Sequence, residues 1–208
     1  MGVDGKETET MVVDLYVDPL CPWAWLTSRW LLEVERVRNI AVNWHIMSLA
    51  VLNEGRELPP QYAALMERGM PPVRLVVAAE EEVGPQAVRP LYEAIGVRYH
   101  VQGRDDDDAV FAEALAAAGL PAELAAAAHD PGWDARVRES HHEGMDPVGM
   151  DTGTPVLHIA GTAIFGPVVS PAPRGEAAGR LFDAVVGCMT TPGFYELKRG
   201  RDVGPIFD

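Results

Sequence analysis

The sequence contains little cysteine. Its two cysteines, Cys21 and Cys188, lie far apart in a chain of 208 residues. Two distant cysteines in a chain of this size exclude a small scaffold held together by disulfides. A lone cysteine is either a reactive group or an inert part of the core, and its surroundings decide between the two. Each cysteine therefore has to be judged by its neighbours.

Positive charge and long apolar runs are also scarce. Lys and Arg total 17 against 31 Asp and Glu, so the formal net charge is -14. Such a surface repels phosphate backbones and anionic lipids, and we expect neither a nucleic acid nor a membrane as partner. No apolar run approaches the ~20 residues that span a bilayer. Residues 1–10 are polar and acidic, unlike a signal peptide, so we expect a cytoplasmic protein.

Several motifs that bind cofactors or catalyse hydrolysis are absent. The sequence has no GxGxxG, no P-loop and no GxSxG. Its six histidines are scattered, and no CxxC, HxxxH or carboxylate set completes a metal site. We expect no metal and no nucleotide cofactor.

The first quarter of the chain predicts a strand, a tight turn, a helix and a second strand. Residues Met11–Val17 form a short run of β-forming residues, which Asp18 and Pro19 end. Pro22 favours a helix start, because the first helical position needs no N–H. Apolar residues then recur at helical spacing, at Trp23, Leu26, Trp30, Val34 and Val37. Alternation over residues 41–47 predicts the second strand.

A long helical region separates this unit from a second strand-containing region. Between residues 57 and 148, helical segments alternate with Pro or Gly; we expect helices near 60–68, 71–83, 86–100, 108–118, 122–129 and 133–143. A hairpin follows over 156–160 and 163–165, and then a helix over 175–189. The order predicts an α/β protein with a thioredoxin-like fold and an inserted all-helical subdomain.

The motifs CPWA, from Cys21 to Ala24, and Gly153-Thr154-Pro155 carry a family resemblance. The chain resembles the DsbA-like oxidoreductases, and most closely their actinobacterial branch of mycothiol-dependent reductases or nitroreductases. The segments that carry the resemblance span nearly the whole chain: 18–34, 47–54, 140–146, 153–161, 165–170 and 196–202. The resemblance implies a discontinuous thioredoxin-like domain over 10–55 and 150–195, a helical subdomain over 56–149 and a tail over 196–208.

One position departs from that branch. Its motif is CPWC, whereas this chain has Ala24 in the fourth position. The sequence does not tell a natural monothiol protein from one whose second cysteine was replaced. The resemblance implies a low-molecular-weight thiol as cosubstrate, with mycothiol expected, and the missing cysteine argues against a dithiol mechanism.

The position of Cys21 predicts a reactive thiol. A cysteine at a helix N-terminus faces unpaired N–H groups and the positive end of the helix dipole, which lower the pKa of a thiol. Cys188 lies on the apolar stripe of the last helix, so we expect it to be buried and inert. The sequence therefore assigns the chemistry to Cys21.

The neighbours of Cys21 follow from the motif and the resemblance. Pro22 and Ala24 belong to the active-site motif, and Trp23 either packs in the core or forms one wall of a cleft. The resemblance implies that Thr154 and a cis Pro155 bind the thiol compound. Asn53 and Tyr62 either line the mouth of the cleft or are solvated loop residues.

These observations predict a thiol-dependent oxidoreductase. The Cys21 thiolate attacks a disulfide or a small electrophile, and a second low-molecular-weight thiol releases the mixed disulfide. Two alternatives remain: a thiol transferase or isomerase similar to the kappa-class glutathione transferases, and a thiol-binding module without catalysis. A homodimer is also left open.

Overall fold

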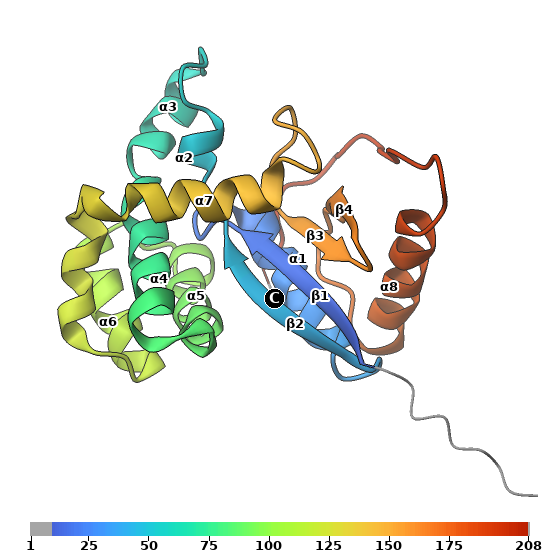
Figure 1. Ribbon diagram of the computed structural model, residues 1–208, viewed down its shortest axis with the longest axis horizontal. Coiled ribbons are helices and arrows are strands. Elements are labelled where there is room, and N and C mark those ends of the chain that lie inside the picture. Colours follow the sequence, from blue (N-terminus) through green and yellow to red (C-terminus); the bar gives the residue numbers. More distant parts are fainter. Residues whose placement is uncertain (1–9, 208) are drawn as a thin grey trace, which may run out of the picture.

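Four strands form one sheet in the computed structural model, which describes residues 10–207 (Figure 1). They are β1 (Met11–Val17), β2 (Ile40–Ile46), β3 (Val156–Ile159) and β4 (Thr162–Phe165), in the order β2-β1-β3-β4. β1 pairs parallel to β2 and antiparallel to β3, and β3 pairs antiparallel to β4. The sequence predicts these four strands and the hairpin of β3 and β4, and the structure adds their order in the sheet. The N-terminal stretch, judged above to be no signal peptide, lies outside the described residues except for Thr10.

The crossover between the two parallel strands is α1 (Pro22–Val34), which begins where the sequence predicts. Pro22 occupies the first helical position, and the apolar stripe of the helix buries Leu26, Trp30 and Val34. The Trp30 indole N–H donates to the carbonyl of Ala178 at 3.1 Å, which ties α1 to α8 (Gly175–Met189). The first turn of α1 is thus fixed at the carboxyl end of β1.

Helices fill the chain between β2 and β3. They are α2 (Leu49–Leu52), α3 (Pro60–Glu67), α4 (Met70–Val83), η1 (Pro85–Ala87), α5 (Val88–Gly96), η2 (Val97–Val101), α6 (Asp107–Ala118), η3 (Ala122–His129), η4 (Pro131–Trp133) and α7 (Asp134–Met145). η2 is a π-helix, and η3 is a 3₁₀ helix. The sequence predicts helix in both places without the type, because helix propensity does not select among these hydrogen-bond patterns.

The two faces of the sheet are covered by different helices. In Figure 1, α1 lies behind the sheet and α7 crosses in front of its upper end. The Ser140 hydroxyl on α7 donates to the carbonyl of Ile46 at 2.6 Å, and the backbone N–H of Ser48 donates to Nδ1 of the buried His141 at 3.3 Å. α7 is therefore attached to the end of β2, close to where β1 also ends.

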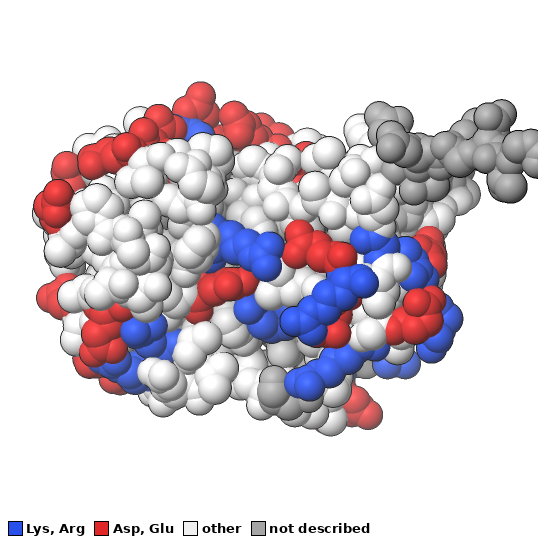
Figure 2. All heavy atoms as spheres, turned by 90° about the horizontal axis from the view of Figure 1, so that it is seen from below, with Lys and Arg blue, Asp and Glu red and all other residues white. Residues whose placement is uncertain are grey.

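Acidic and basic side chains alternate on the underside of the molecule (Figure 2). That face consequently shows no broad area of one sign. Ion pairs between elements are also present: the Arg38 guanidinium lies 2.8 Å from Glu176 and 2.7 Å from Asp183 on α8. Across residues 10–207, no helix combines the length and the apolar character that a membrane crossing requires.

Candidate active site

The turn between β1 and α1 carries Cys21. The Cys21 backbone N–H donates to the carbonyl of Asp18 at 3.0 Å, which closes the turn. Cys21 itself has extended backbone angles, φ -83° and ψ 112°, and is the N-cap of α1. An N-cap side chain faces the free N–H groups of the first turn. The sequence thus places the sulfur at the positive end of the helix.

Two polar groups lie against the sulfur. The Ala24 N–H donates to Cys21 Sγ at 3.4 Å, and Sγ lies 3.5 Å from the Thr154 carbonyl oxygen. Thr154 is fixed in turn, since its hydroxyl donates to the carbonyl of Tyr16 at 3.0 Å. The Thr154–Pro155 peptide bond is cis, the expected geometry. The structure therefore brings together CPWA and Thr154-Pro155, which are far apart in the sequence.

The protonation of Cys21 differs from the expectation. Only 5 % of the residue is exposed. Burial raises the pKa of the Cys21 thiol to about 12, the N–H groups of Ala24 and Trp23 lower it, and the Asp18 carboxylate raises it further. The lowered pKa expected from the helix N-terminus alone is therefore wrong for this closed arrangement, because desolvation of the thiolate outweighs the two N–H groups. Ionisation requires that the site be opened to water or to a charged ligand.

Asp18 is a functional candidate that the sequence reasoning did not identify. Its carboxylate is completely buried and accepts the Leu20 N–H at 2.8 Å and the Leu49 N–H at 2.7 Å. Burial raises the pKa of Asp18 to about 6, although these two bonds lower it. The carboxylate holds the Cys21 turn against α2. The sequence shows only an acid before a proline, which is typical of a turn and gives no sign of burial.

His100 lies behind the same turn. Its Nε2 is 2.9 Å from the carbonyl oxygen of Pro19, and since a carbonyl only accepts, Nε2 carries the hydrogen. Burial lowers the pKa of His100 to about 4, so the ring is neutral near pH 7. This contact joins η2 to the turn across more than 80 residues of sequence. No periodic pattern signals it.

The other predicted site residues, Trp23, Asn53 and Tyr62, differ in how far they are buried and in what they contact. Trp23 is half-buried and packs against the core, with the Arg201 guanidinium 4.7 Å from the centre of its ring. Asn53 ends α2, and its amide donates to the carbonyl of Leu49 at 2.8 Å. Tyr62 lies on α3 and is 55 % exposed. Asn53 is thus close in sequence to the α2 turn that Asp18 holds, whereas Tyr62 is a surface residue.

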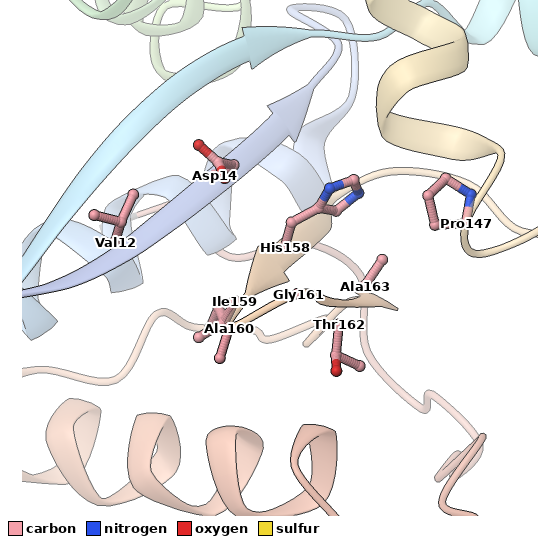
Figure 3. A pocket seen from close by; sticks show the side chains of 9 residues that line it. All are labelled: Val12, Asp14, Pro147, His158, Ile159, Ala160, Gly161, Thr162 and Ala163. Carbon is pink, nitrogen blue, oxygen red and sulfur yellow. The ribbon is translucent and has the colours of Figure 1, made fainter.

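A hollow lies elsewhere on the sheet, away from Cys21. Figure 3 shows Asp14 from β1 and His158 from β3 beside it, with the hairpin after β3 forming its other wall. Next to it, the Tyr16 ring stacks on His45 and is tilted by 39° against His158, and in each pair the centroids are 4.7 Å apart. Neither cysteine lines this hollow, so it is not the thiol site. Within residues 10–207, no three His, Cys, Asp or Glu side chains are grouped to hold a metal ion.

The fold is shared with solved thiol oxidoreductases. The probable DsbA oxidoreductase SCO1869 from Streptomyces coelicolor is 18% identical, with a TM-score of 0.59 over 92% of this chain and 94% of that one. The cytosolic disulfide reductase DsbM from Pseudomonas aeruginosa, solved with GSH, is 19% identical, with a TM-score of 0.53 over 85% of this chain and 99% of that one. These likenesses establish a DsbA-like thioredoxin fold.

Sequence comparison identifies the family. The chain is 34% identical over 198 residues to Rv2286c, an uncharacterized protein of Mycobacterium tuberculosis (strain ATCC 25618 / H37Rv), and the match covers 93% of this chain and 84% of that one. Residues 20–199 match the model of the family described as Rv2466c-like, mycothiol-dependent nitroreductase Rv2466c. The matched range contains both Cys21 and the Thr154-Pro155 pair. The chain therefore belongs to the Rv2466c-like family of mycothiol-dependent nitroreductases and is an oxidoreductase with a thioredoxin-like fold.

Proposed function

We propose that this oxidoreductase works through a single thiol, with Cys21 as its nucleophile and mycothiol as its cosubstrate. The observation that carries the proposal is the position of Cys21 Sγ, between the Ala24 N–H at 3.4 Å and the Thr154 carbonyl at 3.5 Å. The first group stabilises a thiolate, and the second is a backbone acceptor beside the reacting sulfur. The family match supplies the class of thiol.

The reaction consists of two thiol–disulfide exchanges. The Cys21 thiolate attacks one sulfur of a disulfide R–S–S–R′; a bond forms between Cys21 and R–S, the S–S bond breaks, and R′–S⁻ leaves with the electron pair. A mycothiol thiolate then attacks the R–S sulfur, so that R–S–S–mycothiol leaves and the Cys21 thiolate is regenerated. In net terms R′–S⁻ is released and R–S passes to mycothiol as a mixed disulfide, so one disulfide is exchanged for another; full reduction of R–S takes a second mycothiol, which attacks that mixed disulfide. Because position 24 is alanine, the second exchange has to come from a free thiol.

Other residues have supporting roles in this proposal. The Thr154 carbonyl, which lies 3.5 Å from the sulfur, accepts a hydrogen bond from the amide of the bound thiol compound, and Pro155 fixes that carbonyl in place. In the same proposal Trp23 offers a flat wall for the bound thiol, and Asn53 and Tyr62 are candidates for its outer edge. We assign Cys21 and Thr154 to one thioredoxin-like domain (10–55 and 150–195) and the helices of 56–149 to a subdomain beside it. The cytosolic DsbM neighbour is consistent with a cytoplasmic site of action.

The test is to trap the mixed disulfide. The protein is reduced, desalted and mixed with mycothiol disulfide, and intact mass spectrometry then measures the adduct. We expect one mycothiol per chain, located on the peptide that contains Cys21. Cys188→Ser should retain the adduct, and Cys21→Ser should lose it. An adduct confined to Cys188 would contradict the proposal.

A turnover measurement separates the alternatives. We expect the protein to accelerate the reduction of a chromogenic disulfide by mycothiol, with the Cys21 adduct accumulating when mycothiol is limiting. A transferase or isomerase would turn over its substrate without any covalent change at Cys21, because there the fold activates the bound thiol itself. A binding module would form a complex with mycothiol and leave the rate of exchange unchanged.

A further inference from the structure

The chain after α8 returns to the Cys21 site. In Figure 1 it leaves α8, crosses the upper side of the molecule and ends near the middle, at the label C. Residues 196–207, called the tail here, include few buried side chains; Leu197, for example, is 83 % exposed. A segment with so little core packing keeps its place only through particular contacts. The contacts that hold this tail lead to the Cys21 turn.

The end of the tail is anchored at Phe207. Its ring packs against the core and lies 5.7 Å from the ring of His100, at an interplanar angle of 30°. His100 in turn binds the Pro19 carbonyl, two residues before Cys21. Ser170 adds a second anchor, since its hydroxyl donates to the Gly204 carbonyl and accepts the Ile206 N–H, both at 3.0 Å. The end of the tail is therefore attached to the turn that carries the sulfur.

Arg201 joins the tail to the CPWA motif. Its guanidinium lies over the Trp23 ring, 4.7 Å from the centroid, and an arginine in this position is held by a cation–π interaction. Trp23 is two residues from Cys21, and the positive charge of Arg201 acts on Cys21 against the negative charge of Asp18. Asp18 is buried beneath the turn, whereas Arg201 is exposed above it. Arg201 thus brings a positive charge to the CPWA motif, on the ring of Trp23.

We propose that the tail forms the outer wall of the Cys21 site and that Arg201, held on Trp23, supplies the positive charge that attracts thiolates and other anionic sulfur reagents to Cys21. The proposal rests on Cys21 being the reacting thiol, as proposed above. In both exchanges the attacking or leaving sulfur is an anion, so a cation at the mouth of the site stabilises each of them. Arg201 is a positioning residue, because it acts on the reacting sulfur through its charge and its place on Trp23.

The experiment compares two alkylating reagents of the same shape and reactivity class. Iodoacetate is an anion and iodoacetamide is neutral, so the ratio of their rates at Cys21 reports the local charge. The rates are measured in a Cys188→Ser background. We expect Arg201→Gln to lower the iodoacetate-to-iodoacetamide ratio about threefold to tenfold, the effect of one charge near the sulfur in a partly solvated site. Arg201→Lys should retain most of the ratio. The pH profile of iodoacetamide alkylation should move to higher pH in Arg201→Gln only.

The tail offers a matched control at Arg199. It is exposed, lies two residues from Arg201 and carries the same charge, so Arg199→Gln should change the ratio less than twofold. Phe207→Ala removes the anchor; we expect faster alkylation by iodoacetamide, because the wall opens, and a ratio close to that of Arg201→Gln. In the unsubstituted chain, added salt should lower the ratio, since exposed charges are screened. This last measurement needs no variant that has to fold.

An unchanged ratio in Arg201→Gln, or an equal fall in Arg199→Gln, would overturn the inference, because the charge at Cys21 would then be absent or diffuse. Alkylation requires neither mycothiol nor turnover, so the two proposals fail separately. If the Cys21–mycothiol adduct forms and the iodoacetate-to-iodoacetamide ratio is the same with and without Arg201, only the role of the tail is wrong. If the ratio depends on Arg201 and mycothiol disulfide leaves no adduct, only the choice of thiol is wrong.

Discussion

The two cysteines of this chain occupy opposite ends of two helices and differ in almost every physical respect. Cys21 precedes the first turn of α1, is 5 % exposed and has polar partners at 3.4 and 3.5 Å. Cys188 lies in the last turn of α8 and is only partly buried. The positive end of a helix dipole stabilises a thiolate and the negative end opposes it. The choice of Cys21 as the proposed nucleophile therefore depends on its place at the helix start and on its polar neighbours, and not on how accessible it is.

The largest expected effect is the loss of activity when one of the two cysteines is replaced. Cys21→Ser should reduce mycothiol-dependent disulfide reduction by about a thousandfold or more, because a serine hydroxyl cannot replace the sulfur nucleophile. Cys188→Ser, the matched control, should retain activity within about twofold. The rates of both variants are measured against the uncatalysed exchange at the same mycothiol concentration. Comparable losses of activity in the two variants would mean that both thiols take part in the reaction. That result would contradict the proposal that Cys21 works alone.

The next effect comes from restoring the cysteine of the related motif. Ala24 is fully buried and its N–H already contacts Cys21 Sγ, so Ala24→Cys should place a second sulfur within reach of the first. We expect release of a chromogenic thiol from a preformed Cys21 mixed disulfide to become nearly independent of added thiol. At low millimolar thiol, release should be faster by about a hundredfold, because the attack becomes intramolecular.

The unsubstituted chain and Ala24→Cys are distinguished by how the rate of release depends on the concentration of added thiol. In the unsubstituted chain, single-turnover release should be first order in added thiol. Ala24→Ser has a similar size and no thiol, and it should behave in the same way. Release from the unsubstituted chain at a rate that ignores the thiol concentration would show that another group resolves the adduct, and the monothiol mechanism would be wrong.

A third effect corrects an expectation drawn from the sequence. A stripe of apolar residues on the last helix predicts that Cys188 reacts only after unfolding, yet the residue is partly exposed. We now expect Cys188 to react with a bulky aromatic disulfide in the native state, at a rate within about tenfold of its rate in the unfolded chain, because the reagent reaches it without a structural change. Both rates are measured in Cys21→Ser. A native reaction too slow to measure would show that the last turn of α8 shields the thiol.

Much of the fold could be predicted from local sequence patterns, because Pro22, the helical stripe after it and the alternating strand have short periods. The meeting of Cys21 with Thr154 followed only from the family resemblance, since the two residues are 133 positions apart. The burial of Asp18, the contact of His100 with Pro19 and the return of Arg201 to Trp23 could not be predicted. Each depends on how separate helices and the tail pack, which leaves no periodic signal in the chain. Cys188 shows a related limit: a stripe indicates which face of a helix is apolar and not how deeply its last turn is covered.

The smallest effect tests the cause of the difference between the thiols. Asp18 lies beside Cys21, where its carboxylate raises the pKa of the thiol. Cys188 lies on α8, so a change at position 18 should leave its surroundings as they are. Asp18→Asn removes that charge and keeps one oxygen acceptor for the turn. Near pH 8 we therefore expect alkylation of Cys21 by iodoacetamide to become about threefold faster, while the rate of Cys188 stays constant as an internal reference.

The size of this increase depends on pH. The pKa of Asp18 is raised to about 6, so the carboxyl is ionised at pH 8 and protonated below about pH 5, and the rates of the two proteins should converge as the pH falls through that window. A constant rate ratio from pH 5 to pH 8 would show that Asp18 acts by holding the turn against α2 and not by its charge.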